Sequence, residues 1–251
     1  MDASGNIGNV NDWTSSKGVT GVTLVTEDVE IVIAPDRWAD DYDGSWNGNS
    51  MSAWGGYGKN VTGVKTTTSN ADAMLDFAGL NNTNQIIKQL SGTTDSYSSH
   101  YTGAPAAEYC RAYSKGYKAA GQWYLPSAGE MNQLIINVNA INEALDKISG
   151  KTLNFCEATW TSTQADSYRA WFGDWSNYLL SYHYKHGSGY DYEVRPICQI
   201  ENTTGNIITF KIGGVSYLGE NQMTWQDWIN SSYNTAGFKN TNNYLCTSSG
   251  V

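Results

Sequence analysis

The chain has 251 residues and a mass of 27.5 kDa, which allows one large domain or a domain with a small appendage. Hydrophobic residues make up 40% of it and aromatic residues 13%, and no apolar run reaches about 18 residues, so the composition excludes a disordered chain and predicts no membrane insertion. A net charge of −9 disfavours nucleic acid and anionic lipid as partners.

The N-terminal part of the sequence predicts a lead-in, a hairpin and a long loop. Residues 1–19 are rich in Gly, Asn and Ser and lack the basic and apolar stretches of a secretory signal. Two β-branched runs, residues 22–25 and 29–33, are separated by two acidic residues and predict a hairpin. Residues 35–69 carry several Trp and Tyr among Gly and Asn, which indicates an ordered loop anchored by aromatic side chains.

The middle of the chain predicts short amphipathic helices. Asn82 and Thr83 suit the N-terminus of a helix that ends at Gly92. Pro105 suits the first turn of a second helix, with apolar residues at three-and-four spacing after it.

A third helical region carries the clearest local signal of the sequence. Ser127 and Glu130 have the spacing of a capping box, in which each residue satisfies a backbone amide of the other. The apolar stripe that follows continues to Gly150, with a break near Asn139 that suggests two helices.

The last part of the sequence changes to short aromatic-rich strands. These begin at Trp160 and end in the apolar run 194–200, so helices in the middle and strands at both ends predict an α+β fold. Residues 201–205 resemble a linker, and we place a domain boundary near residue 203. A hairpin and a short Trp-bearing helix over 224–231 are expected beyond it.

The cysteines and histidines give no recognised chemical motif. Cys110, Cys156, Cys198 and Cys246 lie far apart, which favours buried thiols, with disulfides as the alternative. The histidines accompany no nucleophile motif, and the chain has no phosphate-binding loop or dinucleotide fingerprint. We therefore expect no cofactor and no metal, and exposed contact roles for His183 and His186 rather than metal ligation.

The acidic residues leave one catalytic alternative open. The aspartates within residues 36–43 favour a solvated loop over a calcium site, because they lack the ligand pattern of a calcium-binding loop. The paired carboxylates of sugar hydrolysis could in principle come from Asp36, Asp40, Asp41 and Asp43, or from Asp166, Asp174 and Asp191.

The most unusual stretch is residues 160–192, in which Trp, Tyr and Phe alternate with Ser, Asn, Gly, His and Asp. The tryptophans fit a buried core, and core packing is the alternative reading of the tyrosines. The mixture favours a binding surface, because Tyr gives rigid contact area and small polar residues give adaptable hydrogen bonds, as in antibody paratopes.

Several spaced motifs resemble a bacterial and phage family of C-type-lectin-fold domains over roughly residues 20–200. They are GQWYLPSAGE at 121–130, WTSTQ at 160–164, AW at 170–171 and VRP at 194–196, with WGGYG at 54–58, DFAG at 76–79 and AAEYC at 106–110 upstream.

Within that family the chain is most similar to the variable proteins of diversity-generating retroelements, in which an error-prone reverse transcriptase rewrites adenine-templated codons near the end of the lectin domain. The resemblance implies a variable region at about 160–196 with fixed scaffold residues, namely Trp160, Ser162, Trp171, Trp175, Val194 and Arg195. The implied ligand-facing residues are Ala165, Ser167, Tyr168, Arg169, Phe172, Asp174, Tyr178, Leu180, Tyr182, His183, Tyr184, His186, Gly187, Gly189, Tyr190, Asp191 and Tyr192.

The resemblance implies three parts and a binding function. These are a lead-in at 1–19, a C-type-lectin-fold domain at 20–202, and a small module at 203–251 that resembles C-terminal modules of gut-phage structural proteins. The calcium-dependent sugar motifs of animal lectins are absent, and so is the cysteine pair motif of the sulfatase-activating enzymes that share the fold. We therefore expect no enzyme.

The expected partner is a cell-surface protein or glycan, with assembly into an oligomer or virion to raise avidity. The lack of a signal peptide suits a phage tail component that folds in the bacterial cytoplasm and acts on the virion or outside the cell. Two alternatives are a bacterial surface adhesin of fixed specificity and a carbohydrate-active enzyme.

Overall fold

The computed structural model describes most of the chain up to residue 200 and one hairpin beyond it. The described residues are 1–39, 53–99, 101–153, 158–187, 192–200, 210–212 and 215–217. The chain divides into two units, Met1–Ile200 and Glu201–Val251, which are described separately. The second unit contains β10 (Phe210–Ile212) and β11 (Val215–Tyr217), the antiparallel hairpin expected there. The Trp-bearing helix expected over 224–231 lies outside the described residues.

The first sheet of Met1–Ile200 is antiparallel and joins the two ends of this unit. Its strand order is β1-β2-β9-β4. The backbone amide of Thr26 donates to the carbonyl oxygen of Val29 at 2.9 Å, so the predicted two-residue connection between the first two strands is confirmed. The strands are β1 (Val22–Val25), β2 (Glu30–Ile33), β4 (Trp123–Tyr124) and β9 (Ile197–Gln199).

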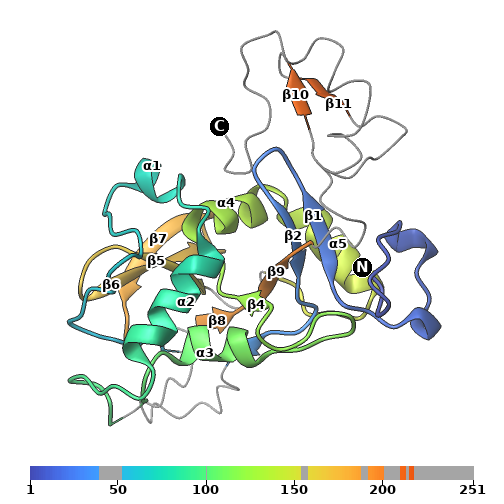
Figure 1. The fold of residues 1–251 in the computed structure, drawn as a ribbon. Coiled ribbons are helices and arrows are strands. Elements are labelled where there is room, and N and C mark those ends of the chain that lie inside the picture. Colours follow the sequence, from blue (N-terminus) through green and yellow to red (C-terminus); the bar gives the residue numbers. More distant parts are fainter. Residues whose placement is uncertain are drawn as a thin grey trace, which may run out of the picture. The chain divides into compact units, whose positions relative to one another are not determined.

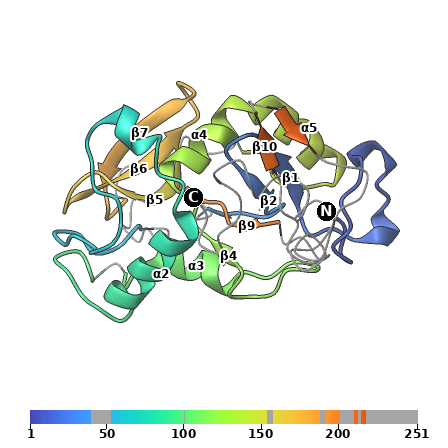
Figure 2. The same cartoon turned by 45° about the horizontal axis from the view of Figure 1, so that its top comes forward.

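The second sheet lies at the other end of the unit (Figures 1 and 2) and has the order β3-β8-β5-β6-β7. All its pairs are antiparallel except β5 with β8. β7 is an edge strand because it stands last in this order. Beside that edge, the Asn70 side-chain amide donates to the Leu180 carbonyl oxygen at 3.3 Å. The strands are β3 (Trp38–Ala39), β5 (Ala158–Gln164), β6 (Arg169–Asp174), β7 (Leu179–Tyr184) and β8 (Tyr192–Val194).

In the described part of the chain, five α-helices connect and cover the sheets. They are α1 (Asn70–Ala73), α2 (Gly79–Leu90), α3 (Pro105–Ala112), α4 (Ala128–Ile136) and α5 (Val138–Lys147). The predicted start of α2 is wrong, because Asn82 and Thr83 lie inside the helix. The Thr83 hydroxyl donates to the Gly79 carbonyl oxygen at 2.8 Å within α2, and the Asn82 amide donates to Asp76 at 2.9 Å. Thr83 also accepts a hydrogen bond from the Leu125 amide at 3.0 Å, so both side chains make contacts inside the helix or beyond it rather than capping its start.

The capping box at the start of α4 forms as predicted. The Ser127 backbone amide donates to Glu130 Oε2 at 2.7 Å, and Tyr124 Oη donates to Glu130 Oε1 at 3.1 Å. Burial raises the pKa of the Glu130 carboxyl to about 7, against the opposing effect of these hydrogen bonds. The break between α4 and α5 falls at Asn137, close to the predicted position.

Apolar side chains are buried on both sides of the second sheet. One cluster includes Trp171 and Leu180 and packs with Met131 and Ile135 of α4. Another cluster, which includes Phe172, packs with residues of α2 and α3. The middle of β6 is therefore covered on both faces.

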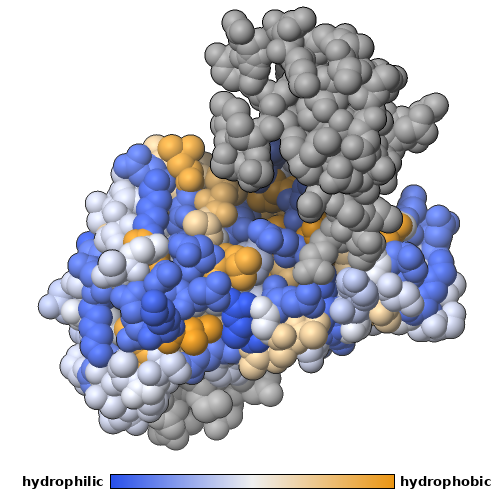
Figure 3. Space-filling model, in the orientation of Figure 1, coloured by the Kyte–Doolittle hydropathy of each residue, from blue (hydrophilic) through white to orange (hydrophobic). Residues whose placement is uncertain are grey.

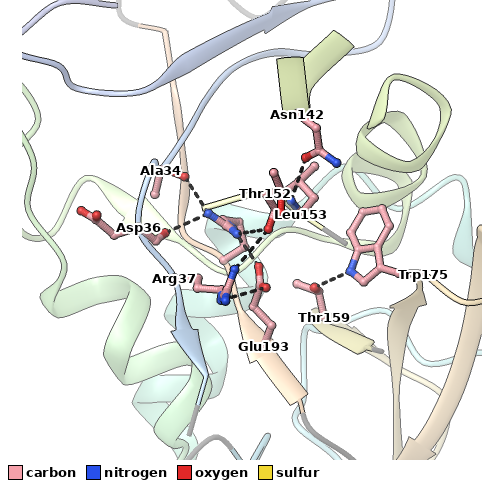
Figure 4. Close-up of polar contacts among 10 residues, drawn as sticks. Ala34, Asp36, Arg37, Asn142, Thr152, Leu153, Thr159, Trp175 and Glu193 are labelled. Atoms are coloured by element: carbon pink, nitrogen blue, oxygen red, sulfur yellow. Dashed lines mark hydrogen bonds and ion pairs between the residues drawn. The ribbon is translucent and has the colours of Figure 1, made fainter. Parts of the chain in front are cut away.

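A buried ion pair after β8 is linked by hydrogen bonds to the segments that follow β2 and α5 (Figure 4). Arg195 is fully buried and its Nε donates to Glu193 Oε1 at 2.8 Å, while its terminal nitrogens donate to the carbonyl oxygens of Ala34, Asp36 and Thr152 at 3.1 to 3.2 Å. Burial raises the pKa of the Glu193 carboxyl, and Arg195 and then Arg37 oppose that shift.

The arrangement confirms an α+β fold with helices between strands. The lead-in is ordered and packs on this unit: the Met1 ammonium donates to the Gly21 carbonyl oxygen at 2.7 Å, and Trp13 Nε1 donates to the Gly18 carbonyl oxygen at 2.9 Å. Trp54, one of the aromatics expected to anchor the long loop, is buried and donates to the Thr161 carbonyl oxygen at 2.7 Å. No helix among the described residues is long and apolar enough to cross a membrane.

Candidate binding surface

Five aromatic side chains meet beside the end of β7. We call them the tyrosine surface: Tyr57, Tyr97, Tyr168, Tyr184 and His186. The Tyr57 ring lies at the centre, with centroids 4.8 Å from Tyr97, 5.1 Å from Tyr168, 6.1 Å from Tyr184 and 5.0 Å from His186. Tyr168 and Tyr184 are 49% and 44% exposed, so the surface presents ring area to solvent.

Asp95 holds two members of the surface through their backbone. Its carboxylate accepts hydrogen bonds from the Tyr57 amide at 2.9 Å and from the Tyr97 amide at 2.8 Å. It also accepts from the Tyr101 hydroxyl at 2.9 Å, and the pKa of that phenol is raised, by burial first and by Asp95 second. Asp95 therefore holds the backbone of these two residues independently of the ring contacts.

A second hydrogen bond ties the Tyr57 segment to the β5–β6 turn, where the Gly58 amide donates to the Ser167 carbonyl oxygen at 2.9 Å. In the same turn, Asp166 accepts from the Tyr168 amide and from Arg169 Nε, at 2.8 and 2.7 Å. The turn that presents Tyr168 is thus internally braced.

A neighbouring polar and aromatic group continues the surface along β6 and β7. The Arg169 guanidinium lies 4.6 Å from the centre of the half-buried Tyr182 ring, which packs edge-on against Trp171 at 5.0 Å. At the far end of the hairpin, Tyr178 is 53% exposed and has a φ of 53°, in the left-handed region. Asp174 accepts from the amides of Ser176 and Asn177 in that turn.

The structure separates the expected ligand-facing residues into exposed and buried sets. Ser167, Tyr168, Arg169, Asp174, Tyr178, Tyr182, His183 and Tyr184 are exposed or half-buried. The expectation of an exposed face is wrong for Ala165, Phe172, Leu180 and Tyr192, which belong to the core clusters. The physical reason is that both faces of the second sheet are covered.

The expectation of exposure is also wrong for His186, which is 8% exposed, and for Gly187, because both are buried. The His186 ring stacks on the Tyr97 ring, with their centroids 4.1 Å apart. Burial lowers the pKa of His183. Gly189, Tyr190 and Asp191 lie outside the described residues.

Of the aspartates named for the catalytic alternative, Asp166 and Asp174 accept hydrogen bonds within their own turns, whereas Asp40, Asp41, Asp43 and Asp191 lie outside the described residues. Within the part of the chain that the structure describes, no three His, Cys, Asp or Glu residues come together as metal ligands. Cys110 is a buried free thiol and Cys198 is buried as well, whereas Cys156 and Cys246 lie outside the described residues.

Sequence reasoning missed Tyr57, Tyr97 and Asp95 as parts of this surface. Tyr57 was expected only as a loop anchor, and residues 93–99, which combine Thr, Asp, Tyr and Ser, share the composition of the tyrosine-rich stretch. That shared composition was the available signal.

On the face seen in Figure 3, hydrophilic and apolar residues are mixed, with strongly apolar colour gathered beside α1.

The comparisons with known proteins give one distant structural similarity. No protein-family model matches the chain, and no curated protein matches it. The crystal structure of a fimbrial protein from Bacteroides ovatus ATCC 8483 is similar over 67% of this chain, with 18% sequence identity and a TM-score of 0.43. The chain spans 35% of that protein's length. A similarity this distant carries no functional argument.

Proposed function

We propose that the protein is a binding protein that attaches to a cell-surface protein or glycan through the tyrosine surface. The observation that carries the proposal is the convergence of aromatic rings from three separate segments, near residues 57, 97 and 168–186, into one partly exposed cluster. Tyrosine rings provide large contact area at low entropic cost, and the small polar residues beside them adapt to hydrogen-bonding groups of a ligand.

The finer proposal is a C-type-lectin-fold domain whose surface is diversified by a retroelement and displayed on a phage tail. It is supported by the sequence motifs, and the exposed positions of Ser167, Tyr168, Arg169 and Tyr184 are compatible with it. A bacterial adhesin of fixed specificity would use the same surface with unvarying residues. In both cases the protein acts by binding, without catalysis.

The first test measures binding of the labelled protein to intact cells of a panel of gut bacteria and to an array of purified glycans. The variant replaces Tyr168 and Tyr184 by Ser, and Tyr117→Ser is the matched control, because Tyr117 is 40% exposed outside the tyrosine surface. We expect the double variant to lose at least about tenfold in affinity, as for two contact residues at a binding hot spot. Equal binding by the double variant and the control would contradict the proposal.

The second test separates the retroelement from the fixed adhesin. Deep sequencing of the encoding locus in a growing population should find a reverse-transcriptase gene, an adenine-rich near-copy of codons 160–196, and substitutions confined to template-adenine positions. An invariant locus without a near-copy would leave the adhesin of fixed specificity.

A further inference from the structure

A buried lysine lies directly beneath the tyrosine surface. Lys185 follows β7 and stands between Tyr184 and His186, yet its own side chain is fully buried. Lysine side chains are almost never fully buried unless their ammonium groups are satisfied. The Lys185 ammonium is therefore expected to have hydrogen-bond acceptors inside the protein.

The Lys185 ammonium bridges two other segments. Its Nζ donates to the Lys59 carbonyl oxygen at 2.7 Å and to Gln164 Oε1 at 2.9 Å, and it lies 4.5 Å from the centre of the Trp54 ring. Gln164 in turn exchanges hydrogen bonds with the Val61 backbone, accepting from its amide and donating to its carbonyl oxygen, each at 3.0 Å. The group thus joins the 53–61 segment to the end of β5.

The backbone of Lys185 adds hydrogen bonds to the 53–61 segment and to the β5–β6 turn. Its amide donates to the Tyr168 carbonyl oxygen at 2.9 Å, and its carbonyl oxygen accepts from the Gly55 amide at 3.2 Å. One residue therefore contacts each of the segments that carry Tyr57, Tyr168 and Tyr184.

The surroundings of Lys185 lower the pKa of its ammonium group. Burial lowers the pKa of Lys185 to about 7, while the carboxylates of Asp166 and Asp95 act in the opposite direction. A neutral amine keeps two N–H donors, which is the number of acceptors that Nζ contacts here. Both protonation states can therefore hold the two segments together.

We propose that Lys185 is a positioning residue for the tyrosine surface: its side chain ties the 53–61 segment to the end of β7 and so sets where Tyr57 stands relative to Tyr168 and Tyr184. The inference rests on the proposed function in assuming that this surface binds a ligand. Prior positioning lowers the cost of ordering these rings on binding.

The first test needs no ligand. Lys185→Met keeps most of the apolar stem and removes the donors, and Lys88→Met, an exposed lysine on α2, is the control. Amide hydrogen exchange of residues 53–61 should be at least about tenfold faster in Lys185→Met than in the wild type and the control, while α4 is unchanged. Unchanged exchange in 53–61 would overturn the inference.

If Lys185→Met does not fold, the same exchange is measured on Lys185→Gln, which keeps a polar group but is too short to reach both acceptors. It should show faster exchange in the same segment, and an unchanged rate would equally overturn the inference.

The second test is a double-mutant cycle on binding to the cells that the wild type recognises. Tyr168→Ser should reduce affinity at least about tenfold in the wild type but less than about threefold in Lys185→Met, because the Tyr57 ring that packs against Tyr168 has then already lost its position. Additive losses would show only general destabilisation and overturn the inference. Failure of the wild type to bind any target would count against the proposed function, whereas the exchange experiment would still decide the role of Lys185.

Discussion

The buried pair of Glu193 and Arg195 and the tyrosine surface differ in how their side chains are fixed. Arg195 is fully buried, and its donors are matched to a carboxylate and to backbone carbonyls from three other positions. In the tyrosine surface, ring contacts are added to segments that backbone hydrogen bonds already hold. The difference indicates that the first region carries stability, whereas side chains in the second can change with little effect on folding.

The largest expected effect follows from removing the buried cation. Arg195→Met should lower the free energy of unfolding by about 3–5 kcal/mol, because it leaves the Glu193 charge buried with only Arg37 nearby at 3.5 Å. Denaturant unfolding measures it. Arg169→Met is the control: its ion pair with Asp166 is about one-third exposed, so the loss should stay below about 1 kcal/mol. Equal losses of unfolding free energy in Arg195→Met and Arg169→Met would contradict the stabilising role given to the buried pair.

A pH-dependent effect of intermediate size is expected from Glu130. Its pKa is about 7 in the folded protein against 4.5 for an unperturbed glutamate, so its stabilising contribution is complete below about pH 4.5 and is lost as the pH rises through 7. Glu130→Gln should remove a decline in the free energy of unfolding of roughly 1–3 kcal/mol over that range. The measurement is denaturant unfolding at a series of pH values.

The control for this slope is Glu143→Gln, since Glu143 is an exposed glutamate on α5. It should keep the decline of the wild type. If Glu130→Gln also keeps the decline, burial of that carboxyl is not its source.

A smaller and opposite effect is expected at the tip of the β6–β7 hairpin. Tyr178 has a left-handed φ of 53°, a conformation that Asn tolerates better than Tyr. Tyr178→Asn should raise the free energy of unfolding by about 1 kcal/mol. Tyr168→Asn, at an exposed tyrosine without a left-handed φ, should give no gain, so a gain at both positions would point away from backbone strain.

The smallest effect is expected within the tyrosine surface. Tyr184→Ser should change the free energy of unfolding by about 0.5 kcal/mol, as for an exposed side chain, whereas Tyr192→Ser should cost about 3 kcal/mol or more because that ring is buried against Trp160 at 3.9 Å. Thermal and denaturant unfolding of the two variants compares them directly. A large loss for Tyr184→Ser would place this surface in the stabilising core.

Local patterns predicted local structure well. The hairpin at 22–33, the helix starting at Pro105 and the capping box at Ser127 each depend on residues within a few positions of one another. The predicted start of α2 failed because the Thr83 hydroxyl donates within its own helix and accepts from the Leu125 amide, a contact between segments distant in sequence.

The candidate site was predicted only in part for the same reason. Composition located Tyr168 and Tyr184, but Phe172 and Tyr192 have similar composition around them and are buried, because covering layers on both faces of the sheet decide exposure. Tyr57 joins the tyrosine surface through packing against Tyr168, which is distant in sequence, and a local sequence pattern carries no information about such a contact.

The hydrogen bond from Asn70 to the Leu180 carbonyl has a consequence for the mode of recognition. β7 is the outer strand of its sheet, and an open strand edge is a template for β-augmentation, in which a peptide adds a further strand through main-chain hydrogen bonds. Asn70 occupies one of the acceptors on this strand, and α1 begins at that residue. Strand addition along β7 would first have to displace this contact, so under the proposed binding function a ligand at this edge would be recognised through side chains, and a single codon change could alter its recognition.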